Sequence, residues 1–270
     1  NVRALDEEDK VVTLVGQLRR YNVMICGVCN TKLADSGSTE IEDYTLWCSG
    51  SKDGRLQLGV GIAVSNRMEK HVSKFELVDE RIVLLRLKFK VCNVTVIEAY
   101  APSEPAKEDS RKRFYNKLQE ILESVPKHDV LLLLGDFGAQ VGTNITGGHV
   151  LGPHGMGPED ANGVRLLEFC SGNKLVVCNT QFQQKNSHEA TWVSPEDQRE
   201  KIVDFVITRE QHATSVLDVR PYRSADIGSD HNLVLAEVRV KLFDYIVKCF
   251  RPFKLKNDSA ATTEDWQSCT

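Results

Sequence analysis

Five polar or ionisable side chains stand at the ends of apolar segments that are typical of buried strands. They are Tyr100, Asp136, Asp204, Asp230 and His231. In α/β proteins the ends of neighbouring strands meet at one edge of a sheet, where chemistry is commonly placed. Carboxylates there could bind a divalent cation, a carboxylate or imidazole could activate water, and a phenol could donate to an anionic oxygen. Together these residue types suit hydrolysis of a phosphodiester.

Each of these residues also has a purely structural interpretation. Residues 130–134 are apolar without interruption, which predicts a strand buried on both faces. Gly135 lets the backbone turn after this strand, and Asp136 could simply cap that turn. A lone histidine such as His231 is more often structural than catalytic. The order of the whole set along the chain therefore carries the argument, rather than any single member.

The elements that must position these residues are mostly strands. Apolar residues at helical spacing predict helices over 6–21, 110–124 and 162–169, the last capped by Asn162. Residues 31–53 are predicted to be mostly loop, and 140–159 a long glycine-rich loop. Predicted strands cover 23–29, 44–48, 58–64, 75–78, 82–88, 91–100, 130–134, 175–178, 190–193, 202–207, 215–219 and 233–240. So many strands beside so few helices argue against a doubly wound sheet and favour two packed sheets with helices outside.

Composition is that of an ordinary globular protein. The 270 residues are 41% hydrophobic and 27% charged, with a net charge of −4 and a pI of about 6.0. The pI argues against avid nonspecific binding of nucleic acid but leaves room for a local basic groove. No apolar run is long enough to span a bilayer and no signal peptide opens the chain. We expect a domain over 1–243 and a basic, then polar, tail over 244–270.

Cysteine usage points to a reducing compartment. Most of the eight cysteines lie within apolar strand-like segments, where cysteine behaves as a small core residue. Cys26 and Cys29 have the spacing of half a zinc site, but no second pair completes it. We therefore expect an intracellular protein, nuclear or cytoplasmic, that is not secreted.

Four stretches, taken in order, resemble the motif series of the endonuclease/exonuclease/phosphatase superfamily. They are Tyr-Ala-Pro-Ser at 100–103, Leu-Gly-Asp-Phe at 134–137, Val-Asp-Phe at 203–205 and Ser-Asp-His-Asn at 229–232. Stretches 1–3, 59–63, 190–195 and 225–231 are similar to the endonuclease domains of RTE-type non-LTR retrotransposons. The resemblance implies a DNase I-like fold, a four-layer α/β sandwich of two packed mixed β-sheets flanked by helices. It places the site where the sheets meet at one edge.

The resemblance also implies a metal site and a histidine pair. Asp230 would help to bind Mg²⁺, or Mn²⁺, and Asn1 would help to organise the metal and phosphate region. Asp204 would hydrogen-bond His231 and fix its tautomer, so that the imidazole faces the phosphate.

Further implied roles concern the attacking water and the substrate. Asp136 would orient or deprotonate the water, and Tyr100 would donate to a phosphoryl oxygen. Asn232 and Gln140 would contact the substrate. The implied partner is DNA, bound by a monomer without a membrane.

Three departures from the family pattern bear on activity. The strand-end glutamate that binds the metal is replaced by Asn30, which keeps a neutral oxygen but loses the charge that favours a hard cation. The asparagine after Gly-Asp-Phe is replaced by Gly138, and losing one transition-state donor costs about 3–4 kcal/mol, a factor of roughly 10²–10³. The family's first strand begins several residues before Asn1, so we expect one sheet to lack an interior strand.

Two hypotheses of different classes follow. The first is a Mg²⁺-dependent DNA endonuclease whose activity is impaired at Asn30 and Gly138. The second is a non-catalytic remnant of a retrotransposon, which at most binds nucleic acid or protein. A phosphatase of small phosphoesters or lipids shares the fold and is a third, less favoured interpretation, because of the retrotransposon-like stretches.

Overall fold

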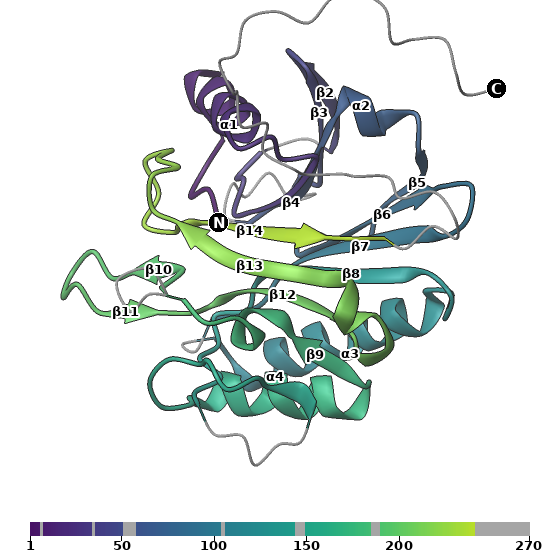
Figure 1. Ribbon diagram of the computed structural model, residues 1–270. Helices are drawn as coiled ribbons and strands as arrows, with labels where there is room; N and C mark the ends of the chain where they lie inside the picture. The colour runs from purple at the N-terminus through teal and green to yellow at the C-terminus, as the bar shows by residue number, and fades with distance from the viewer. Residues whose placement is uncertain are drawn as a thin grey trace, which may run out of the picture.

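The helices and strands stack in four layers, with helix, sheet, sheet and helices in that order (Figure 1). The computed structural model describes residues 1–5, 8–33, 36–50, 58–103, 106–143, 149–184 and 190–240. The tail predicted over 244–270 and the domain limit predicted at residue 243 therefore lie outside the described residues.

A six-stranded sheet forms one inner layer. The strands β7 and β8 are parallel and all other neighbours in this sheet are antiparallel, so the sheet is mixed. The predicted strand at 130–134 is β8, which lies inside the sheet and extends to Asp136. In spatial order the strands are β5 (Val72–Leu77), β6 (Ile82–Lys88), β7 (Asn93–Tyr100), β8 (Val130–Asp136), β12 (Asp204–Arg209) and β9 (Leu175–Val177).

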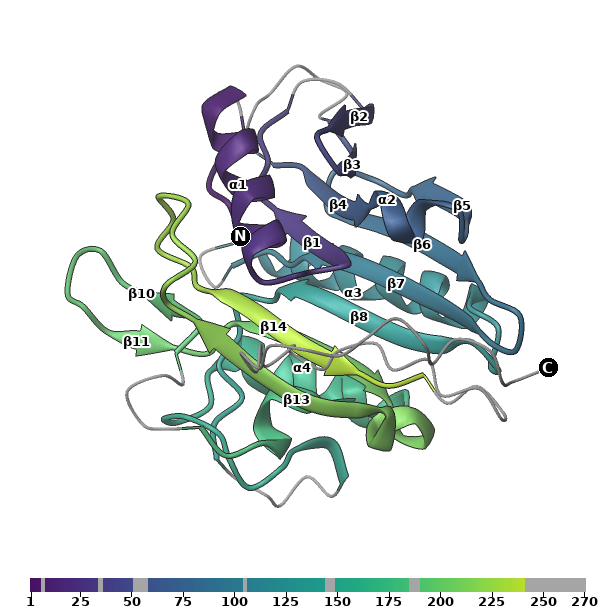
Figure 2. The ribbon, with the colours of Figure 1, turned by 45° about the horizontal axis from the view of Figure 1, so that its top comes forward.

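The second inner layer contains a four-stranded antiparallel sheet and a two-stranded ribbon, which pack on the same face of the six-stranded sheet (Figure 2). In spatial order the sheet is β1 (Ile25–Cys29), β4 (Val60–Ser65), β3 (Tyr44–Cys48) and β2 (Gly37–Ile41). The ribbon is β13 (Val216–Tyr222) and β14 (Leu233–Val238). A separate small hairpin is β10 (Trp192–Val193) and β11 (Glu200–Lys201).

Helices form the outer layers. Helix α1 (Glu8–Arg20) packs on the four-stranded sheet, while α3 (Glu108–Ser124) and α4 (Ala161–Gly172) pack on the outer face of the six-stranded sheet. Shorter helical turns are α2 (Asn66–Glu69), η2 (Cys178–Gln181) and η4 (Glu210–Ser215). In the described part of the chain no helix is long and apolar enough to cross a bilayer.

Three apolar interfaces hold the layers together. The first joins α1 to the four-stranded sheet through residues such as Leu18 and Leu46. The second joins the two sheets, with Ile62 facing the six-stranded sheet. The third joins that sheet to α3 and α4, with Leu118 and Leu131 fully buried. Each interface removes a continuous apolar surface from water, which is the main driving force for this stacking. The predicted four-layer α/β architecture is confirmed.

Two local predictions were wrong. Residues 37–41 form the edge strand β2 instead of a loop, because the paired β3 supplies hydrogen-bond partners that a polar sequence does not reveal. The cap of α4 is Asp160, whose carboxylate accepts from the Gly163 amide, and not Asn162. The Asn162 side chain instead donates to the carbonyl of Gly138 at 3.0 Å. It therefore ties the helix start to the segment after β8.

Gly135 fixes how the end of β8 meets β7. Its φ is 143°, and a Cβ atom added there would lie 1.8 Å from the carbonyl oxygen of Ala99. Only glycine allows this close approach. As a result, Asp136 lies in register with Tyr100 across the parallel pair. The glycine that the sequence places before Asp136 is thus required for the geometry of the site.

A cavity of about 620 Å³ separates β1 from β14. Leu132 and Leu134 of β8 form part of its wall, together with residues of both strands. Among the described residues, β1 pairs only with β4, and β14 only with β13. The expected absence of an interior strand stays a prediction.

Hydrogen exchange should report these one-sided strands. We expect amides of β1 and β14 to exchange at least tenfold faster than those of β7 and β8, because the first two strands have one paired edge each and border the cavity. Exchange followed by mass spectrometry on the intact chain measures this. Equal protection of all four strands would show that the facing edges of β1 and β14 are covered.

Candidate active site

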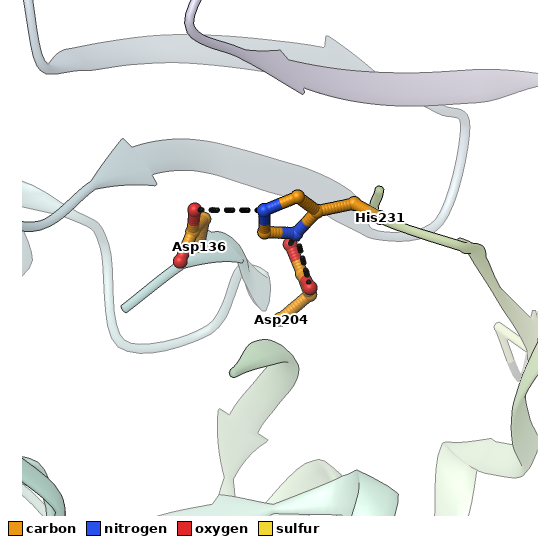
Figure 3. Close-up of side chains that lie close together, drawn as sticks. All are labelled: Asp136, Asp204 and His231. Carbon is orange, nitrogen blue, oxygen red and sulfur yellow. Dashed lines mark hydrogen bonds and ion pairs between the residues drawn. The ribbon is translucent and has the colours of Figure 1, made fainter. Parts of the chain in front are cut away.

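Three ionisable side chains converge at one edge of the sheets. Asp136 ends β8, Asp204 begins β12 in register with Asp136, and His231 precedes β14 (Figure 3). Their ligand atoms lie within 4.8 Å of one another, and all three are buried. The sequence predicted that these residues act together, and the structure brings them together.

His231 is held mainly by Asp204. Its Nδ1 lies 2.9 Å from Oδ2 and 3.1 Å from Oδ1 of Asp204, while its Nε2 lies 3.9 Å from Oδ2 of Asp136 (Figure 3). A carboxylate at Nδ1 favours a proton on that nitrogen and leaves Nε2 to face the site. Only 7% of the His231 side chain is exposed. The imidazole is therefore oriented in advance, as general acid–base chemistry requires.

Asp136 accepts hydrogen bonds from two amide donors. Its Oδ2 accepts from the Asn1 side chain at 2.8 Å, and its Oδ1 accepts from the Gly138 backbone at 2.9 Å. Asn1 is held in turn by Ser229, whose hydroxyl donates to its carbonyl at 2.8 Å. The first residue of the chain thus reaches the predicted region and contacts Asp136.

The two aspartates differ in proton affinity. Burial, and then the charge of Asp204, raise the pKa of Asp136 above its ordinary value of 3.8. Burial alone would also raise the pKa of Asp204, but the adjacent His231, the amino group of Asn1 and hydrogen-bond donors together lower it. Environments that separate the pKa values of two neighbouring acids commonly assign them different roles. Here Asp204 stays ionised beside the imidazole, and Asp136 is the better proton acceptor.

Asp230 is not one of the three clustered residues and has its own partners. Oδ1 accepts from Nε of Arg3 at 2.7 Å, and Oδ2 accepts from Nη2 of Arg3. Trp192 donates its indole N–H to the same Oδ2 at 2.7 Å. Burial would raise the pKa of Asp230, but these donors lower it. The predicted metal ligand is therefore an ionised carboxylate that already holds a protein cation.

The remaining predicted site residues are Tyr100, Asn30, Gln140 and Asn232. Tyr100 lies beside Asp136, and burial raises its pKa, so the phenol keeps its proton. Asn30 follows β1 with a φ of 59°. Gln140 and Asn232 have structural contacts, since their side-chain amides donate to the carbonyls of Met156 and Ala190. Their predicted substrate contacts stay predictions.

Sequence reasoning assigned no role to several residues that build the site. Arg3 and Trp192 hold Asp230, and both lie in stretches that carry the family resemblance. Asn179 anchors the start of β12, because its amide donates to the Asp204 carbonyl at 3.0 Å and accepts from Val206 at 2.8 Å. The sequence around Asn179 contains no pattern that predicts this contact. For Arg3, its place two residues after Asn1 was a signal that the sequence did offer.

Glu98 is a fourth carboxylate near the site. It lies on β7, is 2% exposed, and accepts from the Cys29 thiol at 2.8 Å. Its Oε2 has no hydrogen-bond partner within the described structure and lies where a Cβ of Gly27 would be. Burial raises its pKa from 4.5 to about 8. Glu98 is therefore a proton-holding acid close to neutral pH.

A divalent ion would find suitable donors in the cluster but not at Asp230. Two carboxylates and one imidazole within 4.8 Å are a donor set used by metals such as Mn²⁺. The charge on Asp230 is already matched by Arg3, and Asn30 supplies no second carboxylate. Among the described residues, Asp136 and Asp204 would therefore hold an ion, with His231 beside it.

Comparison with known proteins places the chain in a family. A family profile described as endonuclease-reverse transcriptase matches residues 94–235, more than half of the chain. The chain belongs to the endonuclease/exonuclease/phosphatase superfamily. The matched segment contains Tyr100, Asp136, Asp204, Asp230 and His231.

Two curated relatives are similar along almost the whole chain. Craniofacial development protein 2 of Bos taurus is 35% identical over 268 residues, which are 99% of this chain and 45% of that protein. The protein of the same name from Tragulus javanicus is 35% identical over 265 residues, 98% of this chain and 46% of that protein. The chain thus spans slightly less than half the length of these relatives.

Solved structures show the same fold at low sequence identity. The endonuclease domain of TRAS1, a telomere-specific non-LTR retrotransposon, has a TM-score of 0.60 at 15% identity and covers 87% of this chain and 95% of its own. The 3′ phosphatase NExo from Neisseria, bound to product DNA hairpin, has a TM-score of 0.66 at 17% identity, with 88% and 96% covered. An AP endonuclease from Archaeoglobus fulgidus has a TM-score of 0.64 at 15% identity, with 88% and 97% covered. The fold is therefore DNase I-like.

The buried Glu98 should make stability depend on pH. Because its pKa is raised in the folded state, its contribution is fully present below about 4.5 and is lost as pH rises towards about 8. We expect Glu98→Gln to remove this loss, which amounts to at most about 1.4 kcal/mol per pH unit. Urea denaturation of both proteins at pH 5 and pH 8 measures it. A native chain that loses no more stability than Glu98→Gln would contradict the assignment.

Proposed function

We propose that this chain hydrolyses phosphodiester bonds of DNA, with activity weakened at Asn30 and Gly138. The observation that carries the proposal is the buried contact of His231 with Asp204 on one side and its approach to Asp136 on the other. A buried histidine oriented by one ionised carboxylate and facing a second of raised pKa is suited to moving protons during hydrolysis. The DNA-processing neighbours of the same fold support DNA as the substrate.

The proposed reaction assigns a separate role to each of the site residues. Asp204 holds the imidazole so that Nε2 faces the phosphate, and Asp136 orients a water and accepts its proton. Tyr100, kept protonated by burial, donates to a phosphoryl oxygen. A divalent ion held by the carboxylates of Asp136 and Asp204 would supply charge neutralisation, while Nε2 of His231 stays available to the phosphate. We further propose that the domain acts as a monomer, with Mg²⁺ or Mn²⁺, in the nucleus or cytoplasm.

A non-catalytic, DNA-binding domain is the second candidate. Asn30 and Gly138 favour it, because the family's glutamate and asparagine at these positions are absent. Two such losses, each worth a factor of about 10²–10³, need not add but would leave slow turnover. Activity measurements on matched variants separate the two candidates.

Removing the imidazole should abolish nicking. We expect His231→Ala to lower the rate of supercoiled-plasmid nicking by about 10²–10⁴-fold, the usual contribution of a positioned acid or base. His128→Ala is the matched control, since His128 precedes β8 at the end opposite Asp136 and its side chain is 74% exposed. Equal nicking rates for His231→Ala and the native chain would show that His231 takes no part in the reaction. They would indicate that a contaminating nuclease causes the nicking.

Restoring the two family residues should raise activity. The double change Asn30→Glu, Gly138→Asn is expected to increase the nicking rate at least tenfold. The backbone at Gly138 permits it, because asparagine tolerates its φ of 50° and a Cβ there would lie 3.3 Å from Ser103. Nicking by the double variant alone would identify the native chain as a non-catalytic domain on a competent scaffold. Absence of nicking in both, with a native melting curve, would contradict the proposed function.

A further inference from the structure

Arg3 occupies the position of a cation beside Asp230. The guanidinium meets both carboxylate oxygens, with Nε 2.7 Å from Oδ1 and Nη2 on Oδ2. Trp192 adds a third donor at 2.7 Å to Oδ2. This paired geometry is the strong form of the arginine–carboxylate interaction. A divalent ion at Asp230 would compete with the guanidinium for these oxygens and would be repelled by its positive charge.

The backbone of Arg3 is held in an uncommon conformation. Its φ is 61°, which is unfavourable for a residue with a long side chain. The Arg3 amide donates to the side-chain oxygen of Asn1 at 3.1 Å, and the Val2 amide donates to the Cys29 carbonyl at 3.0 Å. Such strain persists where surrounding contacts impose it, and it is concentrated at functional sites. Here these contacts hold the Arg3 backbone in the conformation in which its guanidinium reaches the carboxylate of Asp230.

The charges around the cluster create a need for a cation. Asp136, Asp204, Asp230 and Glu98 all lie at or next to the site. An incoming phosphate is anionic and would be repelled by those that are ionised. The Arg3 side chain is 52% exposed, and within the described structure its Nη1 has no hydrogen-bond partner. One edge of the guanidinium is therefore fixed by Asp230 and the other is open to a ligand.

We infer that Arg3 takes the place of a divalent ion at Asp230 and contacts a substrate phosphate through the open edge of its guanidinium. Guanidinium groups bind phosphate oxygens in pairs and remain charged at all physiological pH values. Asp230 and Trp192 are then positioning residues for Arg3. The phosphate contact rests on the proposed function, whereas the exclusion of a metal from Asp230 does not.

The first test is metal binding without substrate. We expect Arg3→Gln to bind Mn²⁺ at least tenfold more tightly than the native chain in isothermal titration calorimetry, because the change frees the charge of Asp230. Adding Asp230→Asn to Arg3→Gln should abolish this gain. Arg3→Lys keeps the charge but loses the paired geometry, so its Mn²⁺ affinity should lie between those of the native chain and Arg3→Gln. Unchanged Mn²⁺ affinity in Arg3→Gln, with a native melting temperature, would overturn the inference.

Arg19 provides a matched control. Its guanidinium is also 52% exposed and also binds a carboxylate through Nε and Nη2, that of Asp43, but it lies on α1. Arg19→Gln should leave Mn²⁺ affinity unchanged. An equal gain in Arg19→Gln would show that any lost positive charge produces the effect, and would overturn the role of Arg3.

The second test is DNA binding in EDTA, measured by fluorescence anisotropy with a short labelled duplex. Arg3→Gln should bind about three- to tenfold more weakly, and the slope of log affinity against log salt should fall by about one, as for a lost phosphate contact. Arg19→Gln should bind as the native chain does. Equal binding by Arg3→Gln would overturn the phosphate contact.

The two tests also separate this inference from the proposed function. A native chain that binds no DNA, while Arg3→Gln gains Mn²⁺ affinity, would overturn the phosphate contact and the DNA substrate but support Arg3 as the cation at Asp230. A native chain that nicks DNA, while Arg3→Gln gains nothing, would overturn Arg3 and leave the function in place.

Discussion

The contact between His231 and Asp204 joins two layers of the protein. Asp204 begins a strand of the six-stranded sheet, whereas His231 leads into β14 of the facing ribbon. Both side chains are buried, so their hydrogen bond is little screened by water, and loss of either would leave the other without its partner. The orientation of the imidazole and the lowered pKa of Asp204 depend on this contact, whereas burial, and then the charge of Asp204, raise the pKa of Asp136.

Hydrogen bonds from distant segments surround that contact. Asn1 reaches Asp136, Ser229 holds Asn1, and Trp192 holds Asp230. Asn1 and Trp192 each stabilise a carboxylate that would otherwise repel its neighbours in a poorly solvated place, and Ser229 positions Asn1. The arrangement is thus a network in which negative charge is distributed among specific donors, with Glu98 neutralised by its proton when the pH is below about 8.

The relatives and the site give complementary information. The structural neighbours establish the fold at 15–17% identity, and the curated relatives share 35% identity over a region that is slightly less than half of their length. The side chains of this chain add detail that the fold does not give. Asn30 and Gly138 stand at the two positions where we propose weakened activity, and Arg3 brings a cation of the protein itself to Asp230.

Much of the framework could be predicted from the sequence. The buried strand at 130–134, the helices near 110–124 and 162–169, and the order of Tyr100, Asp136, Asp204 and His231 follow from periodicity and from the family resemblance. These features are local, because burial of a strand or helix leaves its pattern in a few neighbouring residues. The Gly135–Asp136 pair was also visible, although the close contact with Ala99 that requires glycine was not.

Only the tertiary structure decided which side chains meet. Arg3 and Asp230 lie 227 residues apart in the sequence, and Asn1 and Asp136 lie 135 apart. Residues 37–41 form a strand because β3 pairs with them, and Asn162 donates to the Gly138 carbonyl while Asp160 caps the helix. A residue's type states which bonds it can form, but its partner depends on how the layers stack. That is why the sequence by itself determined the candidate residues and the fold, and why the cation held by Asp230 could be recognised only in three dimensions.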